Sequence, residues 1–184
     1  MISPVDCLIL KTYLRKSILH RCMTNKNLVV YYSYEGSTRV IAQTIAEVLD
    51  ADIIGCKPLK DISSKGFMKY IWGGKQVVFK QHPQLETFEK NPDDYDMVII
   101  GTPVWVFTYT PAIRSFLSQV NLKNKKIGLF CCHEGTKGKT LDNLKNVLSN
   151  NTFIGEIDFL NVQKNKEENI LKAKNWAIAL RDKK

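Results

Sequence analysis

Hydroxyl-bearing side chains gather around one glycine at residues 33–38, SYEGST, between two stretches of different character. The segment follows the β-branched and aromatic run NLVVYY and precedes STRVIAQTIAEVLD, whose apolar residues recur at helical spacing. A loop that leads from a buried strand into a helix presents unpaired backbone N–H groups at the positive end of the helix dipole, where an anion is stabilised. Gly36 can adopt backbone angles that let these groups converge, and Ser33, Ser37 and Thr38 add hydroxyl donors. The segment therefore predicts a phosphate site, with an ordinary serine or threonine N-cap as the alternative.

The absence of two known phosphate-binding motifs limits the class of ligand whose phosphate this loop could bind. It contains no G-x-x-x-x-G-K-[ST], so no P-loop lysine is available for a β- or γ-phosphate. It also contains no G-x-G-x-x-G, the fingerprint of dinucleotide-binding loops. A hydroxyl-rich loop with a single glycine and no lysine is best suited to a terminal monophosphate ester.

Two further loops are expected at the same edge of the fold. Residues 101–113, GTPVWVFTYTPAI, contain a proline turn and three aromatic residues outside any obvious core periodicity, Trp105, Phe107 and Tyr109. Residues 131–140, CCHEGTKGKT, are polar and carry two glycines that leave backbone groups accessible. In a doubly wound sheet a ligand binds beyond the carboxyl ends of the strands, at the switch point between the first and third. A phosphate site beside these loops describes a pocket for a flat heteroaromatic ring with a phosphorylated tail.

Apolar runs alternate with helix-like segments from residue 27 onward. Strands are expected at residues 27–32, 51–56, 96–101, 126–132 and 152–160, and helices at residues 37–50, 110–120, 140–150 and 166–184. This alternation predicts a three-layer, doubly wound α/β fold with a five-stranded parallel sheet and right-handed crossovers. The runs ADIIGC, DMVIIG and KIGLFCC are apolar at nearly every position, as expected for strands covered on both faces.

Two parts of the chain depart from this alternation. The connection between the second and third strands is long; residues 66–79 have the spacing of a covering helix, and residues 81–95 are expected to be a surface loop. Residues 1–26 form an N-terminal extension outside the single domain at residues 27–184. The basic, amphipathic spacing of the extension is typical of a helix at a membrane surface, but an equally good interpretation is that translation begins at Met23.

Composition excludes several classes of protein. The chain of 184 residues is 44% hydrophobic and 24% charged and has no run of about 18 to 20 apolar residues, which indicates a globular protein without a transmembrane segment. Its five cysteines are scattered and lack C-x-x-C spacing, so neither a disulfide framework nor a zinc site is expected, and a reducing cytoplasm is the simplest location. The formal charge is +9, but the lysines are spread without interleaved aromatic residues. A solvated basic surface that favours acidic partners is therefore expected rather than nucleic-acid binding.

Other reactive side chains do not form catalytic or metal-binding patterns. Cys131 and Cys132 end a buried strand, one on each face, which favours packing over a thiol nucleophile. His20 and His82 have no companions at ligand spacing, so no metal site is predicted. Ser33 lacks the G-x-S-x-G elbow of α/β-hydrolases.

The three loops together resemble those of the flavodoxin family. SYEGST is similar to the family's Ser-x-Thr-Gly-x-Thr phosphate loop, GTPVWVFTYTPAIRSFL to its glycine-threonine-proline-x-tryptophan flavin loop and following helix, and LFCCHEG stands where threonine-serine-glycine-glycine is common. The resemblance covers residue 27 to about residue 183, including the lengthened second connection of a bacterial subgroup. It implies non-covalently bound FMN and a sheet in the order 2-1-3-4-5.

The resemblance also implies which residues bind the cofactor. They are Ser33, Tyr34, Glu35, Gly36, Ser37 and Thr38 at the phosphate; Thr102, Pro103, Val104, Trp105 and Val106 at the flavin ring; and Cys132, His133, Glu134 and Gly135 in the third loop. Glu35 stands where the family has threonine, so its side chain is expected to point outward, and Arg39 is expected either to offset its charge or to be solvated. His133 is expected to be exposed, with a hydrogen bond to the pyrimidine edge of the flavin as the alternative.

Three functions are compatible with this resemblance. The first is an electron carrier that moves single electrons between partner proteins by means of FMN. The second is an enzyme that takes hydride from NAD(P)H and reduces a quinone or another small acceptor, although no motif here indicates a nicotinamide site. The third is a non-redox interaction module with a degraded pocket, which only the altered third loop favours.

Overall fold

The computed structural model describes residues 26–60 and 82–182. The expected N-terminal amphipathic segment, the alternative start at Met23 and the covering helix at residues 66–79 lie outside the described residues. Within the described part, strands and helices alternate as the apolar pattern predicts, beginning with a strand at residue 27.

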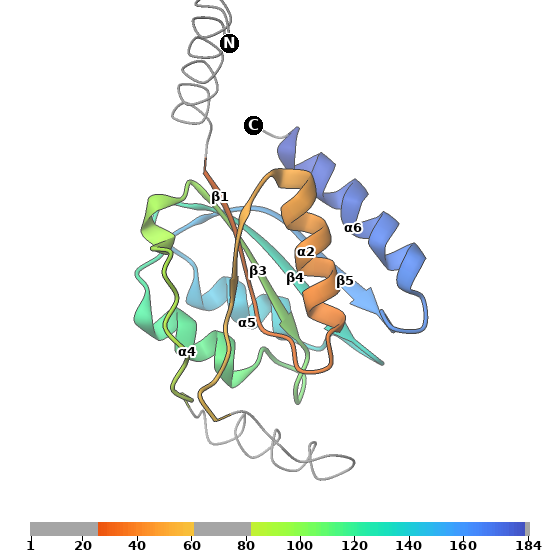
Figure 1. Ribbon diagram of the computed structural model, residues 1–184, viewed down its shortest axis with the longest axis horizontal. Coiled ribbons are helices and arrows are strands. Elements are labelled where there is room, and N and C mark those ends of the chain that lie inside the picture. The colour runs from red at the N-terminus through yellow and green to blue at the C-terminus, as the bar shows by residue number, and fades with distance from the viewer. Residues whose placement is uncertain (1–25, 61–81, 183–184) are drawn as a thin grey trace, which may run out of the picture.

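Five strands of the described chain form one parallel sheet in the order β2-β1-β3-β4-β5, which confirms the doubly wound α/β fold (Figure 1). They are β1 (Asn27–Tyr31), β2 (Asp52–Gly55), β3 (Met97–Pro103), β4 (Lys126–His133) and β5 (Thr152–Leu160). The chain places β2 on one side of β1 and then crosses to the other side to form β3. Val29 at the centre of β1 therefore lies opposite Ile53 of β2 and Ile99 of β3. The loops after β1 and β3 leave the sheet at this switch point.

The helices cover both faces of the sheet, and each face has its own apolar cluster. α2 (Ser37–Leu49) and α6 (Lys166–Arg181) pack on one face, and α4 (Pro111–Gln119) and α5 (Thr140–Val147) pack on the other (Figure 1). In α2, Ile41, Ile45 and Leu49 are buried at intervals of four residues, the stripe that the helical spacing predicts. Phe116 of α4 and Leu144 of α5 are fully buried in the opposite cluster.

Two expectations about the edge strand and its connection are wrong. Asp52 and Ile53 of β2 are exposed, because β2 ends the sheet and the described helices pack mainly over the central strands. The described residues 82–95 are not a plain surface loop, since Leu85 and Tyr95 are buried in the apolar cluster on the α4 face. Leu85 also forms an isolated antiparallel bridge with Pro58, which attaches this connection to the end of β2.

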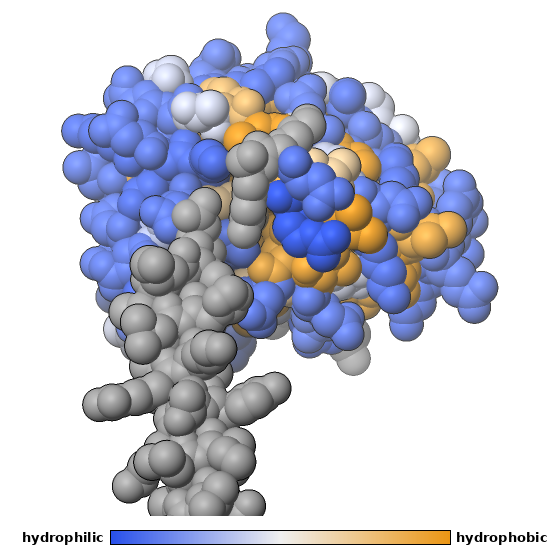
Figure 2. Space-filling model, turned by 90° about the horizontal axis from the view of Figure 1, so that it is seen from above, coloured by the Kyte–Doolittle hydropathy of each residue, from blue (hydrophilic) through white to orange (hydrophobic). Residues whose placement is uncertain are grey.

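Figure 2 shows the molecule from above the view in Figure 1, the side on which β1 begins. This face is mainly hydrophilic, with apolar side chains gathered toward its middle. None of the described helices is long and apolar enough to cross a membrane. The strands run away from this face, so the loops that are predicted to bind a ligand lie at the opposite side of the molecule.

Candidate functional site

A cavity of about 300 Å³ opens at the carboxyl edge of the sheet, where the ends of β1, β3, β4 and β5 meet. Its walls come from four segments of the chain. They are Ser33, Tyr34, Glu35, Ser37 and Thr38 after β1; Pro103, Val104, Trp105 and Val106 at and after the end of β3; Cys132, His133 and Glu134 at the end of β4; and Asn161, Val162, Gln163 and Lys164 after β5. The cavity is large enough for a small molecule or a cofactor.

Most of the residues that the resemblance implied line this cavity, and three do not. Thr102 is fully buried, and its hydroxyl donates to the carbonyl oxygen of Pro103 at 2.9 Å. Gly36 shapes the first loop without lining the cavity, and Gly135 is exposed. The fourth wall, residues 161–164, was missed, although the rule that ligands bind at carboxyl ends applies equally to the loop after the fifth strand. That these side chains bind a cofactor stays a prediction.

The loop after β1 presents the amino end of α2 to the cavity. The hydroxyl oxygen of Ser33 accepts a hydrogen bond from the N–H of Gly36 at 3.1 Å, which closes the loop. Gly36 has a φ angle of 94°, a conformation that glycine adopts without strain, and it is the N-cap residue of α2. Because glycine has no side chain, the alternative of a serine or threonine N-cap is wrong. The first N–H groups of α2 are instead available to an anion.

Gln163 reaches across from the loop after β5 to this first loop. Its side-chain nitrogen donates to the hydroxyl of Ser37 at 3.2 Å and to the carbonyl oxygen of Glu35 at 3.4 Å. The guanidinium of Arg39 approaches from α2, with one nitrogen 3.8 Å from the position that a Cβ on Gly36 would occupy. A positive side chain and a side-chain amide thus lie beside the loop at the amino end of α2, an environment that stabilises an anion.

Trp105 begins a tight turn after β3. The backbone groups of Trp105 and Thr108 exchange two hydrogen bonds, of 2.9 and 3.0 Å. The two residues between them, Val106 and Phe107, have positive φ angles of 47° and 61°. A β-branched residue in this left-handed region is strained, and strain of this kind is concentrated in functional loops.

The three aromatic residues of this loop have different surroundings. The indole of Trp105 lines the cavity and packs edge-on against Tyr32 and Tyr34, with ring centroids 5.8 and 6.0 Å apart. Phe107 is 62% exposed. The expectation that Tyr109 lies outside the core is wrong, because the turn returns the chain to the sheet and buries this side chain in the cluster on the α4 face.

The loop after β4 braces the turn. A Cβ on Gly138 would lie 2.7 Å from the Cβ of Phe107, so a larger residue at position 138 would collide with the turn. The N–H of Lys139 donates to the carbonyl oxygen of Phe107 at 3.0 Å, and the side chain of Asn143 donates to the hydroxyl of Thr108 at 2.9 Å. The turn after β3 and the segment that follows β4 therefore form one connected unit.

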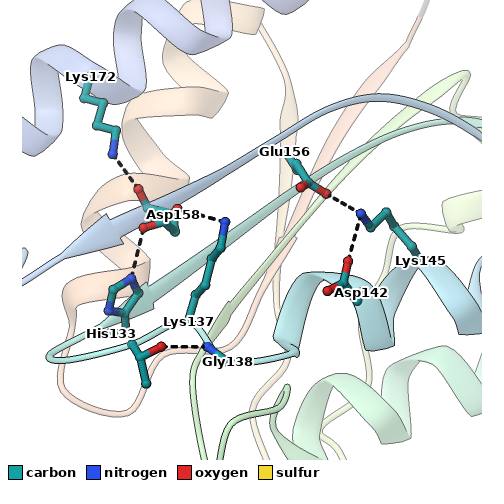
Figure 3. A network of polar contacts seen from close by, with 9 residues as sticks. His133, Lys137, Gly138, Asp142, Lys145, Glu156, Asp158 and Lys172 are labelled. Atoms are coloured by element: carbon teal, nitrogen blue, oxygen red, sulfur yellow. Dashed lines mark hydrogen bonds and ion pairs between the residues drawn. The ribbon is translucent and has the colours of Figure 1, made fainter.

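His133 is the last residue of β4, and its side chain is only 8% exposed, so the expectation of an exposed loop histidine is wrong. The strand continues to His133 because it pairs with Leu160 of β5. Nε2 of His133 lies 3.0 Å from Oδ2 of Asp158 on β5 (Figure 3). The ammonium group of Lys137 lies 3.5 Å from the other carboxylate oxygen, and Lys172 donates to the main-chain oxygen of Asp158 at 2.7 Å.

The carboxylate of Asp158 is the centre of this network. Partial burial acts to raise its pKa, but the hydrogen bond with His133 and the positive charges of Lys137 and Lys172 outweigh burial and lower the pKa overall. Asp158 is therefore a stable anion at neutral pH beside a buried imidazole.

The two cysteines at the end of β4 serve packing, as predicted. Cys131 lies in the apolar cluster on the α4 face and Cys132 in the cluster on the α2 face. Burial raises the pKa of each thiol to about 12, so neither is a thiolate nucleophile at neutral pH. Thr38, which is 1% exposed, forms a hydrogen bond with the side chain of Cys132.

A doubly wound sheet with the amino end of a helix and an aromatic turn at its switch point is the arrangement of a class of proteins that bind nucleotide cofactors. Residues 26–177 match the model of the flavodoxin family, and the chain belongs to that family. The resemblance seen in the sequence is thereby confirmed. A comparison with curated protein sequences finds no match.

Solved structures share this fold at low sequence identity. A Bacteroides eggerthii protein, provisionally assigned as a flavoprotein, is 20% identical, with a TM-score of 0.71 and a match that covers 86% of this chain and 99% of the other. A Lactobacillus acidophilus flavoprotein in complex with FMN is 23% identical, with a TM-score of 0.61 and coverage of 78% and 98%. Rubredoxin oxygen:oxidoreductase from Desulfovibrio gigas is 20% identical, with a TM-score of 0.55 and coverage of 87% of this chain but 37% of the larger one.

Proposed function

We propose that the protein binds FMN non-covalently in the cavity and carries electrons between partner proteins. The observation that supports this most directly is that one cavity joins the amino end of α2, which suits a phosphate, to the indole of Trp105, which suits a flat aromatic ring. FMN carries these two parts at opposite ends of one molecule. Membership of the flavodoxin family and the FMN complex of the Lactobacillus acidophilus relative support the same cofactor.

The residues of the cavity fit FMN in chemical type. The N–H groups at the start of α2 and the hydroxyls of Ser33 and Ser37 would hold the phosphate, and Gln163 would keep this loop in position. Trp105 would lie against the ring, and the end of β4 would form the opposite wall near His133. When bound, FMN supplies a ring system that accepts and releases electrons, while the protein sets its environment and access.

A carrier role requires that a partner protein can approach the cofactor, and the turn after β3 supports it. Val106 lines the cavity and is 50% exposed, and its neighbour Phe107 is 62% exposed. Apolar side chains at the rim of a binding site are typical of surfaces that contact other proteins.

We also propose that the partners are acidic proteins of the cytoplasm. The formal charge of +9 would accelerate encounters with acidic surfaces, and added salt would slow them. Cys56, Cys131 and Cys132 are free thiols in the described part of the chain, which is compatible with a reducing compartment.

The visible spectrum of the purified protein tests the proposal. A yellow protein with flavin absorbance is expected, and apoprotein should regain this absorbance when FMN is added. Anaerobic NADH or NADPH should bleach it only slowly unless a reductase is present. Rapid bleaching by a nicotinamide alone would favour an NAD(P)H-dependent oxidoreductase over an electron carrier. Failure to bind FMN would favour the non-redox interaction module.

A further inference from the structure

We propose that His133 is a redox-linked proton acceptor, held in place by Asp158, which binds a proton when FMN in the cavity is reduced. This inference rests on the proposed function, because it requires FMN in the cavity. It assigns to the end of β4 a role that the binding of oxidised FMN alone does not require.

The imidazole ring of His133 has one nitrogen that is buried and unpartnered among the described residues. This nitrogen is Nδ1, and His133 lines the cavity. Buried polar nitrogens are normally satisfied, so this one beside the cavity is open to a partner or a proton. A neutral imidazole carries a proton on one nitrogen and a lone pair on the other.

The contact with Asp158 determines which nitrogen of His133 carries the proton. The carboxylate of Asp158 accepts a hydrogen bond from Nε2, so Nε2 is protonated and Nδ1 has the lone pair (Figure 3). Nδ1 is therefore the nitrogen that gains a proton. The same carboxylate stabilises the imidazolium that results, as a positioning residue does in other histidine–carboxylate pairs.

Charged groups of both signs lie near the imidazole ring of His133. Lys137 contacts Asp158 from the loop after β4, and Lys172 binds its main-chain oxygen from α6. Glu134 and Lys164 line the same cavity from the loops after β4 and β5, and Glu35 lines it from the loop after β1. Among the described residues none of these groups hydrogen-bonds to Nδ1, so a proton taken up there displaces no existing hydrogen bond.

Reduction of the bound cofactor takes up two electrons and two protons in all. A reductant such as dithionite is oxidised and gives two electrons to FMN, and solvent gives one proton to the cofactor and one to Nδ1 of His133. The negative charge left on the reduced cofactor and the positive charge gained by His133 then offset each other across the cavity. Reduction at alkaline pH, where the second proton is scarce, should therefore be less favourable.

Histidine NMR measures this protonation directly. Protein with isotope-labelled histidine is titrated from pH 5 to 9 as apoprotein, with oxidised FMN and with dithionite-reduced FMN. The protonation midpoint of His133 should rise by at least one pH unit on reduction, a tenfold gain in proton affinity, while the exposed His82 should not move. An unchanged midpoint for His133 with FMN demonstrably bound overturns the inference and leaves the proposed function intact; absence of flavin absorbance overturns both.

Variants add a second readout, the pH dependence of the midpoint potential. Between the two protonation midpoints of His133, reduction of His133→Gln should take up as much as one proton fewer for two electrons, so the slope there should fall by up to about 30 mV per pH unit, a tenfold change in equilibrium per unit. Asp158→Asn should lower the protonation midpoint of His133 in every state. Glu156→Gln is the matched control, because Glu156 lies on the same strand and pairs with Lys145 instead. Equal slopes in wild type and His133→Gln would overturn the inference.

Discussion

The side-chain nitrogen of Gln163 donates a hydrogen bond to the hydroxyl of Ser37 at 3.2 Å, although 126 residues separate the two in the sequence. The same nitrogen lies 3.4 Å from the carbonyl oxygen of Glu35. The loop after β5 is therefore tied to the loop that begins α2. This contact holds the proposed phosphate site in place from the loop after β5, whereas the sequence had indicated only the loops after β1, β3 and β4.

Gln163→Ala should weaken FMN binding by about 0.5 to 1.5 kcal/mol, the usual net value of a hydrogen bond, because the first loop loses its tie. Quenching of FMN fluorescence on titration with apoprotein measures the change. Gln119→Ala is the control, since Gln119 is exposed at the end of α4 and does not line the cavity. Unchanged affinity in Gln163→Ala would show that the tie does not support the site.

Gly36→Val should weaken FMN much more than riboflavin, because a β-branched residue is strained at a φ angle of 94° and only FMN carries the phosphate. Gly36→Asn is the matched variant. Asparagine tolerates the left-handed region better than valine does, and a Cβ here meets nothing closer than 3.8 Å. Fluorescence titration measures the affinities of each variant for both ligands. Equal losses of affinity for FMN and riboflavin would show that the phosphate does not bind at this loop.

Trp105→Ala should loosen the cofactor and restore flavin emission, because an aromatic contact adds about 0.5 to 1.5 kcal/mol beyond area burial and quenches the ring. Trp105→Phe should keep part of the affinity. Steady-state fluorescence of the loaded variants checks this. If emission stays quenched without the indole, Tyr34, which lies edge-on to Trp105 and lines the cavity, becomes the better candidate for the ring contact.

Charge reversal at Lys137 and Lys139, to glutamate, should make the second one-electron reduction of bound FMN harder, because negative charge near the cavity opposes an added electron. A shift of 59 mV corresponds to about a tenfold change in this equilibrium. The control reverses Lys26 and Lys123, which lie just before β1 and before β4, at the amino edge of the sheet. Charges there are screened, since the Debye length at 0.1 M salt is about 10 Å.

Spectroelectrochemical titration compares the two double variants with wild type. The variant at Lys137 and Lys139 should have the more negative potential, and the control should match wild type. Equal shifts in both would mean that total charge, rather than charge at the cavity, sets the potential.

Asp158→Asn should reduce the stability of the apoprotein at neutral pH and make it less sensitive to acid. The folded state lowers the pKa of Asp158, so its contribution is present above the unfolded value of 3.8 and is lost as pH falls through the lower folded value. The side chain is 33% exposed, which limits the effect to about 1 kcal/mol or less. Urea unfolding at pH 7, 5 and 3 should show the difference between variant and wild type shrinking with acid; a constant difference would contradict this assignment.

The alternation of apolar runs with helical spacing was sufficient to predict the sheet, because burial on both faces leaves a local signature in strands such as β3 and β4. The same local signature misled for β2, which is apolar in sequence but exposed at Ile53. Burial of Leu85 and Tyr95 depends on which distant elements lie over them, and no local pattern records that.

Part of the candidate site, like part of the fold, could be predicted from the sequence. In the loops after β1 and β3, the residue types and the positions of glycine and proline predict the turns. Gln163 and Asp158 have no such pattern, because their roles depend on contacts with Ser37 and His133, which are distant in the sequence. The burial of His133 follows from the length of β4, which is set by pairing with β5 and not by its own residues.

The order in which the walls of the cavity occur along the chain has a consequence for synthesis. The first wall is made at Ser33 and the last at residues 161–164, so the cavity cannot close until nearly the whole domain has left the ribosome. Until β3 emerges, β1 has no partner on one side and exposes a row of unpaired backbone groups. Cofactor capture is then a late event, and nascent chains stalled before Gln163 should take up no FMN even though the central strands are already paired.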